Sequence, residues 1–80
     1  MTETLDAPIA AIAAAINAIS DPGELYRESR DVESRVIADM RAARQKRVLE
    51  LKAQGLTWRG IGELLGGISA QRAEQISRGA

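Results

Sequence analysis

The chain has 80 residues, with eleven basic and eleven acidic side chains and neither cysteine nor histidine. This composition excludes disulfide bonds and the usual zinc sites, and the length allows one domain. A chain of this size buries only about 60% of its unfolded surface, so further stabilisation is expected. Association of two chains is the remaining source, which favours a homodimer.

The two halves of the sequence differ in charge. Residues 1–40 contain eight acidic and three basic side chains, whereas residues 41–80 contain three acidic and eight basic ones. Such an asymmetry indicates an acidic half and a basic binding half. We therefore divide the chain into a helical dimerisation segment, residues 1–40, and a binding unit, residues 41–80.

The segment from Ala7 to Ile19 contains no charged side chain. Pro8 fits in the first turn of a helix, which places this helix at residues 8–19. Four isoleucines with spacings of three, four and three residues form one stripe along it: Ile9, Ile12, Ile16 and Ile19. Burial of this stripe is worth about 6–12 kcal/mol, at about 1.5–3 kcal/mol for each side chain, so we expect a second chain to cover it.

Membrane insertion and secretion are not expected for this segment. About thirteen residues are too few to span a bilayer, which takes roughly twenty, and the segment lacks the basic face of a surface-lying helix. No charged region and cleavage site form a secretory signal. The sequence therefore predicts a cytoplasmic protein.

A second helix is predicted over residues 22–54. Asp21 can cap it, Pro22 takes its first position, and Glu24 can reach back as in a capping box. From Glu24 to Gln54 there is no glycine or proline, and apolar residues recur at mostly helical spacings. At about 45 Å it is too long for one small globule to cover, so its first half must project or pair. We assign Leu25, Val32 and Val36 to the dimer interface together with the isoleucine stripe. A break near residues 29–31 is the alternative.

Two short helices follow, at residues 58–65 and 70–78. Thr57 and Ser69 can cap them, and Gly66 and Gly67 end the first because glycine adopts left-handed backbone angles at little cost. Ala73 and Ile76 lie on one face of the second. The predicted core of the last three helices is aliphatic: Val48, Leu51, Leu56, Ile61, Leu65, Ile68, Ala73 and Ile76.

The stretch from Leu56 to Arg78 resembles the helix-turn-helix of small bacterial and phage regulators, including the repressor-like and sigma-factor region 4 groups. The resemblance covers about the last forty residues and rests on seven positions, namely Ile61, Gly62, Leu65, Gly66, Ile68, Ala73 and Ile76. Two features depart from the family pattern. Alignment needs one extra residue in the turn, most simply Gly67, and the small residue usually found as alanine is Gly62, which permits closer approach of the helices.

The resemblance implies that the helix at residues 70–78 reads DNA. Glutamine pairs with adenine and arginine with guanine, so Gln71, Arg72 and Gln75 are the candidate base contacts. Ala70 leaves room for a thymine methyl group. A solvated helix face is the alternative interpretation for these side chains.

Other candidates for contact with DNA lie at helix starts and in the basic half. Free amides at a helix start favour phosphate, which makes Thr57, Arg59 and Ser69 candidates alongside their capping roles. Trp58 is a candidate phosphate donor or, alternatively, part of the core. About half of the basic run at residues 41–47 is expected to reach phosphate. The remaining candidates are Arg44, Arg47 and Arg78.

An enzyme is not predicted, because the sequence has no histidine, no cysteine and no phosphate-cradling glycine motif. No cofactor or metal is expected. The sequence predicts an all-α homodimer that binds double-stranded DNA sequence-specifically as a repressor-like transcriptional regulator. The alternative is a helical adaptor that binds protein, such as a polymerase-associated or antitoxin-like factor.

Overall fold

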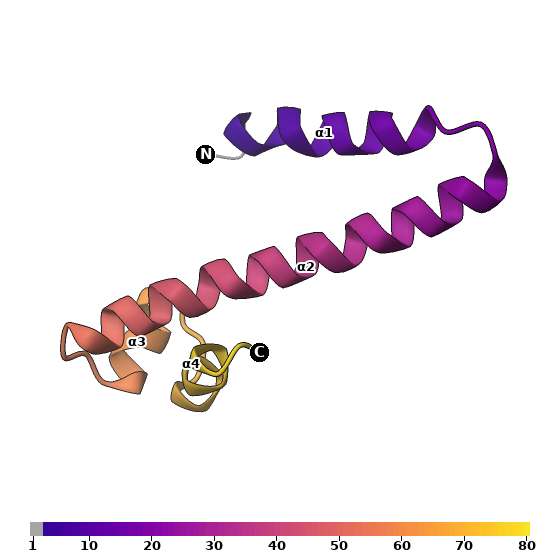
Figure 1. Cartoon of the computed structure of the whole chain (residues 1–80). Helices are drawn as coiled ribbons and strands as arrows, with labels where there is room; N and C mark the ends of the chain where they lie inside the picture. The colour runs from indigo at the N-terminus through magenta and orange to yellow at the C-terminus, as the bar shows by residue number, and fades with distance from the viewer. Residues whose placement is uncertain (1–2) are drawn as a thin grey trace. The chain divides into compact units, whose positions relative to one another are not determined.

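The computed structural model describes residues 3–80, and these form four helices without a strand among them (Figure 1). The helices are α1 (Glu3–Asn17), α2 (Pro22–Ala53), α3 (Trp58–Leu64) and α4 (Ala70–Ser77). The predicted all-α class is therefore confirmed. The chain separates into two compact units, Met1–Arg35 and Val36–Ala80, whereas the sequence placed a boundary after residue 40.

Helix α1 begins at Glu3 and ends at Asn17, so the predicted limits of residues 8–19 are wrong at both ends. Pro8 lies inside the helix. A proline so close to a helix start removes only one backbone hydrogen bond, so the helix extends past it in both directions. After Asn17 the helix ends in a tighter turn, in which the Ile19 amide donates to the Ile16 carbonyl, three residues earlier, at 3.1 Å.

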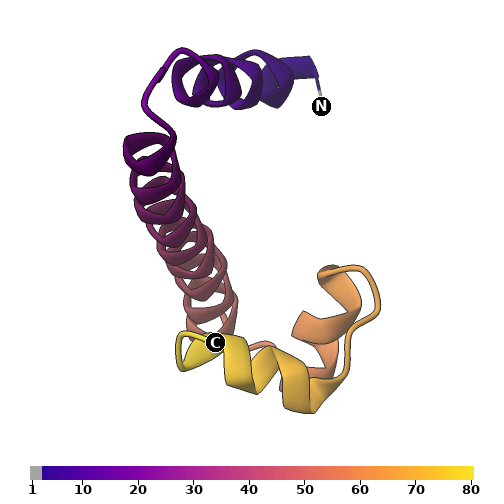
Figure 2. The same cartoon turned by 90° about the vertical axis from the view of Figure 1, so that its right-hand side faces the viewer.

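Helix α2 is continuous from Pro22 to Ala53, as its ribbon shows in Figure 2. Asp21 caps it as predicted: its Oδ2 accepts from the Glu24 amide at 2.8 Å. The alternative break near residues 29–31 is wrong. The Ser29 hydroxyl donates to the Tyr26 carbonyl, three residues earlier, at 2.9 Å. Ser29 therefore lies inside the helix and does not cap a new one.

The unit Val36–Ala80 has a closed aliphatic core. Val48, Ile61, Ala73 and Ile76 are buried, and around them pack the half-buried Leu51, Leu56, Trp58, Leu65 and Ile68. All eight predicted core residues are among these, and Trp58 joins them. The Gln45 amide donates to the Ser77 carbonyl at 3.0 Å, which ties α2 to the last residue of α4. This core holds α3 and α4 against the C-terminal part of α2.

The unit Met1–Arg35 has no comparable core. None of the side chains of residues 4–35 is buried. Ile16, Ile19, Leu25 and Val32 are half-buried, whereas Ile9 is 63% exposed. Among the described residues, no helix has both the length and the apolar character required to cross a membrane.

Candidate nucleic-acid interface

Both short helices begin with the side-chain caps that the sequence predicts. The Thr57 hydroxyl accepts from the Gly60 amide at 3.0 Å, and the Ser69 hydroxyl accepts from the Arg72 amide at 3.0 Å. Each cap satisfies one of the amides that a helix start leaves free.

The turn between α3 and α4 is built on glycine. Gly66 and Gly67 have φ of 98° and 92°, in the left-handed region that side chains rarely adopt. The Gly62 carbonyl accepts from the amides of Gly67 and Ile68, both at 3.0 Å. A Cβ on the buried Gly62 would collide with the Ile68 carbonyl oxygen and approach the Ser69 carbonyl oxygen to 3.2 Å. The turn therefore packs directly on the Cα of Gly62, where a side chain would not fit.

Helix α4 has one buried side and one exposed side. Ala73 is fully buried and Ile76 is 5% exposed. Gln71 and Arg72 are exposed, as is Ala70 at the helix start, whereas Gln75 is half-buried. The phase of α4 therefore presents Gln71 and Arg72 outward more fully than Gln75.

The candidate arginines fall into two groups. Three form ion pairs on their own helices: Arg47 with Glu50 at 3.1 Å, Arg59 with Glu63 at 3.7 Å, and Arg78 with Glu74 at 3.1 Å. Such exposed pairs are worth about 0–1 kcal/mol, so they can exchange for a phosphate. Within residues 3–80 the guanidinium groups of Arg44 and Arg72 have no ion pair or hydrogen bond. Of the five candidate arginines, these two have no carboxylate partner among the described residues.

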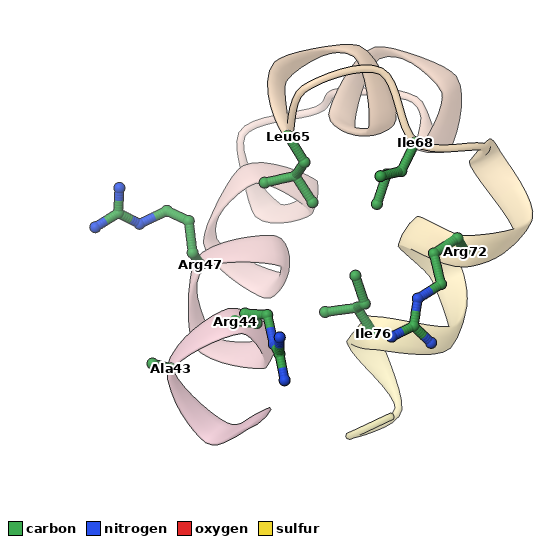
Figure 3. A pocket seen from close by; sticks show the side chains of 7 residues that line it. All are labelled: Ala43, Arg44, Arg47, Leu65, Ile68, Arg72 and Ile76. Carbon is green, nitrogen blue, oxygen red and sulfur yellow. The ribbon is translucent and has the colours of Figure 1, made fainter. Parts of the chain in front are cut away.

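A pocket of about 510 Å³ brings part of the basic set together. It is lined by side chains from α2, the turn and α4, namely Ala43, Arg44, Arg47, Leu65, Ile68, Arg72 and Ile76 (Figure 3). Arg44 of α2 thus shares one concave surface with Arg72 of α4, whereas the guanidinium group of Arg47 extends away from it. Thr57, Trp58 and Arg59, at the start of α3, do not line it.

Trp58 takes the core position that the sequence left open as an alternative. It is half-buried against the core, and Lys52 Nζ lies 4.6 Å from the centroid of its ring. The same ammonium group donates to the Leu56 carbonyl at 3.3 Å. Sequence reasoning missed Lys52, because its contact with Trp58 depends on the path of the loop between α2 and α3.

The residues assigned to a dimer interface differ in exposure. In the unit Met1–Arg35, Ile9 and Ile12 are 63% and 44% exposed. In the other unit, Val36 is 39% exposed and has two exposed apolar neighbours on α2, Ile37 and Met40. Each unit therefore carries apolar surface that its own side chains leave in contact with water.

Known proteins do not identify the chain. No protein-family model, no curated protein and no solved structure matches it. Within the part of the chain that the structure describes, no group of three or more histidine, cysteine or acidic residues could hold a metal ion. The function is therefore inferred from the side chains and geometry of the described residues.

Proposed function

We propose that the protein binds double-stranded DNA as a homodimer, with α3 and α4 acting as a helix-turn-helix and α4 entering the major groove. The observation that carries this proposal is the two-sided character of α4. Ala73 and Ile76 fix it to the core, while Gln71 is exposed and Arg72 is exposed at the edge of the pocket that α4 shares with α2. Side chains of these two types form bidentate hydrogen bonds with adenine and guanine edges.

The basic side chains around α4 supply the contacts that do not depend on sequence. Arg44 has no partner within residues 3–80, and Arg47 is held only by an exposed ion pair with Glu50. Both would bind phosphate and fix the orientation of the protein on the duplex. The free amides at the start of α4, next to Ser69, favour a phosphate in the same way.

The dimer in this proposal is formed through the apolar side chains that one chain leaves exposed. Ile9 and Ile12 on α1 are exposed, and so are Val36 and Met40 on α2. A two-fold dimer buries the same surface on both copies, so each side chain contributes twice. A dimer would also present two copies of α4 to two half-sites, as regulators with paired recognition helices do. The role that follows is repressor-like regulation of transcription.

The test is titration of labelled duplexes with the wild-type protein at several salt concentrations. One duplex is taken from the region upstream of the protein's own gene, and a scrambled duplex has the same base composition. With about six to ten phosphates contacted per dimer, affinity should fall by roughly three to five orders of magnitude between about 50 and 200 mM salt. If neither duplex binds at the lowest salt concentration, the helical adaptor that binds protein becomes the better explanation.

A further inference from the structure

Two uncompensated guanidinium groups lie at one pocket. Figure 3 shows Arg72 extending from α4 alongside Ile76 and Arg44 extending from α2 on the side that faces α4, whereas Arg47 extends away from the pocket. Arg47 is also occupied, because its Nε lies 3.1 Å from Glu50 Oε1. No acidic side chain lines the pocket. Two cations that face one concave surface without a carboxylate create a field that favours an anion between them.

The floor of the same pocket is apolar. It is formed by Leu65 and Ile68, which are half-buried, and by Ile76, which is 5% exposed. The volume of about 510 Å³ lies within the range of roughly 300–1,000 Å³ that small-molecule sites occupy. A phosphate of the DNA backbone would satisfy the guanidinium groups but leave this floor in contact with water. The pocket therefore suits a ligand that has an apolar body as well as a charge.

We infer that this pocket binds a small organic anion, with a carboxylate or phosphate head group and an apolar body. The head group accepts hydrogen bonds from Arg44 and Arg72, whose planar guanidinium groups match the oxygen geometry of both anions. The apolar body lies over Leu65, Ile68 and Ile76. This site goes beyond the proposed DNA binding and does not depend on it, because all the contacts come from one chain.

The test uses octanoate as the probe and follows backbone amide shifts of the isotope-labelled full chain by NMR. Octanol, octylammonium and inorganic phosphate are titrated in parallel. We expect octanoate to shift the amides of Leu65, Ile68 and Arg72, and to bind at least about tenfold more tightly than octanol, because hydrogen bonds to a charged group are worth about 1.5–3 kcal/mol. Octylammonium should not bind.

Three outcomes would overturn the inference. Octanol binding as tightly as octanoate would mean that the guanidinium groups do not contribute. Inorganic phosphate binding as tightly would mean that the apolar floor does not contribute. Shifts confined to α1, which also exposes apolar side chains, would place the ligand elsewhere.

Single substitutions test whether Arg44 and Arg72, but not the neighbouring Arg47, bind the head group. Arg44→Gln and Arg72→Gln each remove an exposed charge from the pocket and should each weaken octanoate by about tenfold, while octanol binding stays unchanged. Arg47→Gln is the matched control, because it removes a charge from the same pocket lining but from a side chain that points away. Equal losses for Arg47→Gln and Arg44→Gln would show a general effect of net charge and overturn the assignment of the head-group site.

Discussion

The units Met1–Arg35 and Val36–Ala80 are both helical, but they solve the burial of apolar side chains differently. In Val36–Ala80, three helices enclose Val48, Ile61, Ala73 and Ile76. In the other unit no side chain of residues 4–35 is buried, although α1 carries a stripe of isoleucines. Helical periodicity is thus sufficient to form a helix, but a core requires segments that return to cover it. Within one chain, Ile9 and Ile12 of the first unit stay exposed, whereas the second unit encloses a core of its own.

The largest expected effect tests whether a partner covers α1. Ile12→Asp should dissociate the proposed dimer, because a charged carboxylate replaces an apolar side chain in a stripe that the dimer would bury. Loss of the isoleucine alone, counted in both copies, costs about 3–6 kcal/mol of dimerisation free energy. Light scattering over a dilution series measures the dissociation of the dimer.

Ala14→Asp is the matched control for this substitution, since residue 14 lies on the opposite side of α1 from the isoleucine stripe. It should leave the dimer largely intact. An unchanged mass for Ile12→Asp, or a monomeric wild type, would contradict the dimer.

The second effect concerns the closed core and its turn. Gly62→Ala should lower the free energy of unfolding by about 1–3 kcal/mol or more, because the new Cβ meets the Ile68 carbonyl oxygen of the turn. Gly60→Ala lies on the same helix, and its Cβ would lie 3.3 Å from Thr57 Oγ1. It should stay within about 1 kcal/mol of the wild type, because alanine also favours the helix. Urea denaturation of both variants compares them, and equal midpoints would show that the turn does not pack tightly on Gly62.

The third effect tests whether the exposed side of α4 reads bases. Gln71→Ala should cost about 1–3 kcal/mol of binding free energy on the preferred duplex and much less on a scrambled one. Titration of both duplexes measures the difference. Equal weakening on the two would show that Gln71 does not contribute to specificity, and the extra residue in the turn, Gly67, would be the first place to look for a rotated helix.

Arg44→Ala should behave differently from Gln71→Ala. If Arg44 meets only phosphate, its loss weakens both duplexes alike and lowers the slope of affinity against salt by about one. Arg35→Ala removes the same charge from the acidic half, where Arg35 pairs with Asp31 at 3.5 Å, and should leave the slope unchanged. A similar slope change for both variants would point to net charge instead of a local contact.

The smallest expected effect is at the contact between Lys52 and Trp58. Lys52→Met removes a cation 4.6 Å from the ring and should cost about 0.5–1 kcal/mol of stability. Lys46→Met is the control, because no contact with an aromatic ring involves Lys46 among residues 3–80. Thermal denaturation distinguishes the two, and an equal loss in both variants would argue against the ring contact.

Local signals predicted most of the fold. Caps at Asp21, Thr57 and Ser69 and the Gly66–Gly67 pair are short-range features, and the spacing of apolar residues was enough to name the core. The start of α1 was not predictable from the preference of proline for the first turn, because one lost hydrogen bond does not stop a helix whose other residues favour it.

The candidate site was less predictable than the fold. The spacing of the apolar Ala73 and Ile76 predicted which side of α4 is buried. The half-burial of Gln75 was not predictable, because it depends on how α4 packs. The pairing of Arg78 with Glu74 follows from their spacing of four residues and could have been anticipated. The pocket shared by Arg44 and Arg72 could not, because these residues are distant in sequence and meet only after α4 packs on α2.

The placement of the two bulky aromatic side chains gives each unit its own optical reporter. The chain has one tryptophan and one tyrosine. Trp58 packs against the core of Val36–Ala80, whereas Tyr26 is 60% exposed in Met1–Arg35. Indole emission, excited selectively at the red edge of its absorption, therefore reports the loss of the closed core, while circular dichroism reports all four helices together. Because α2 alone contributes most of the helical residues and crosses both units, a mismatch between the two signals would measure how far this long helix survives once its C-terminal packing has melted.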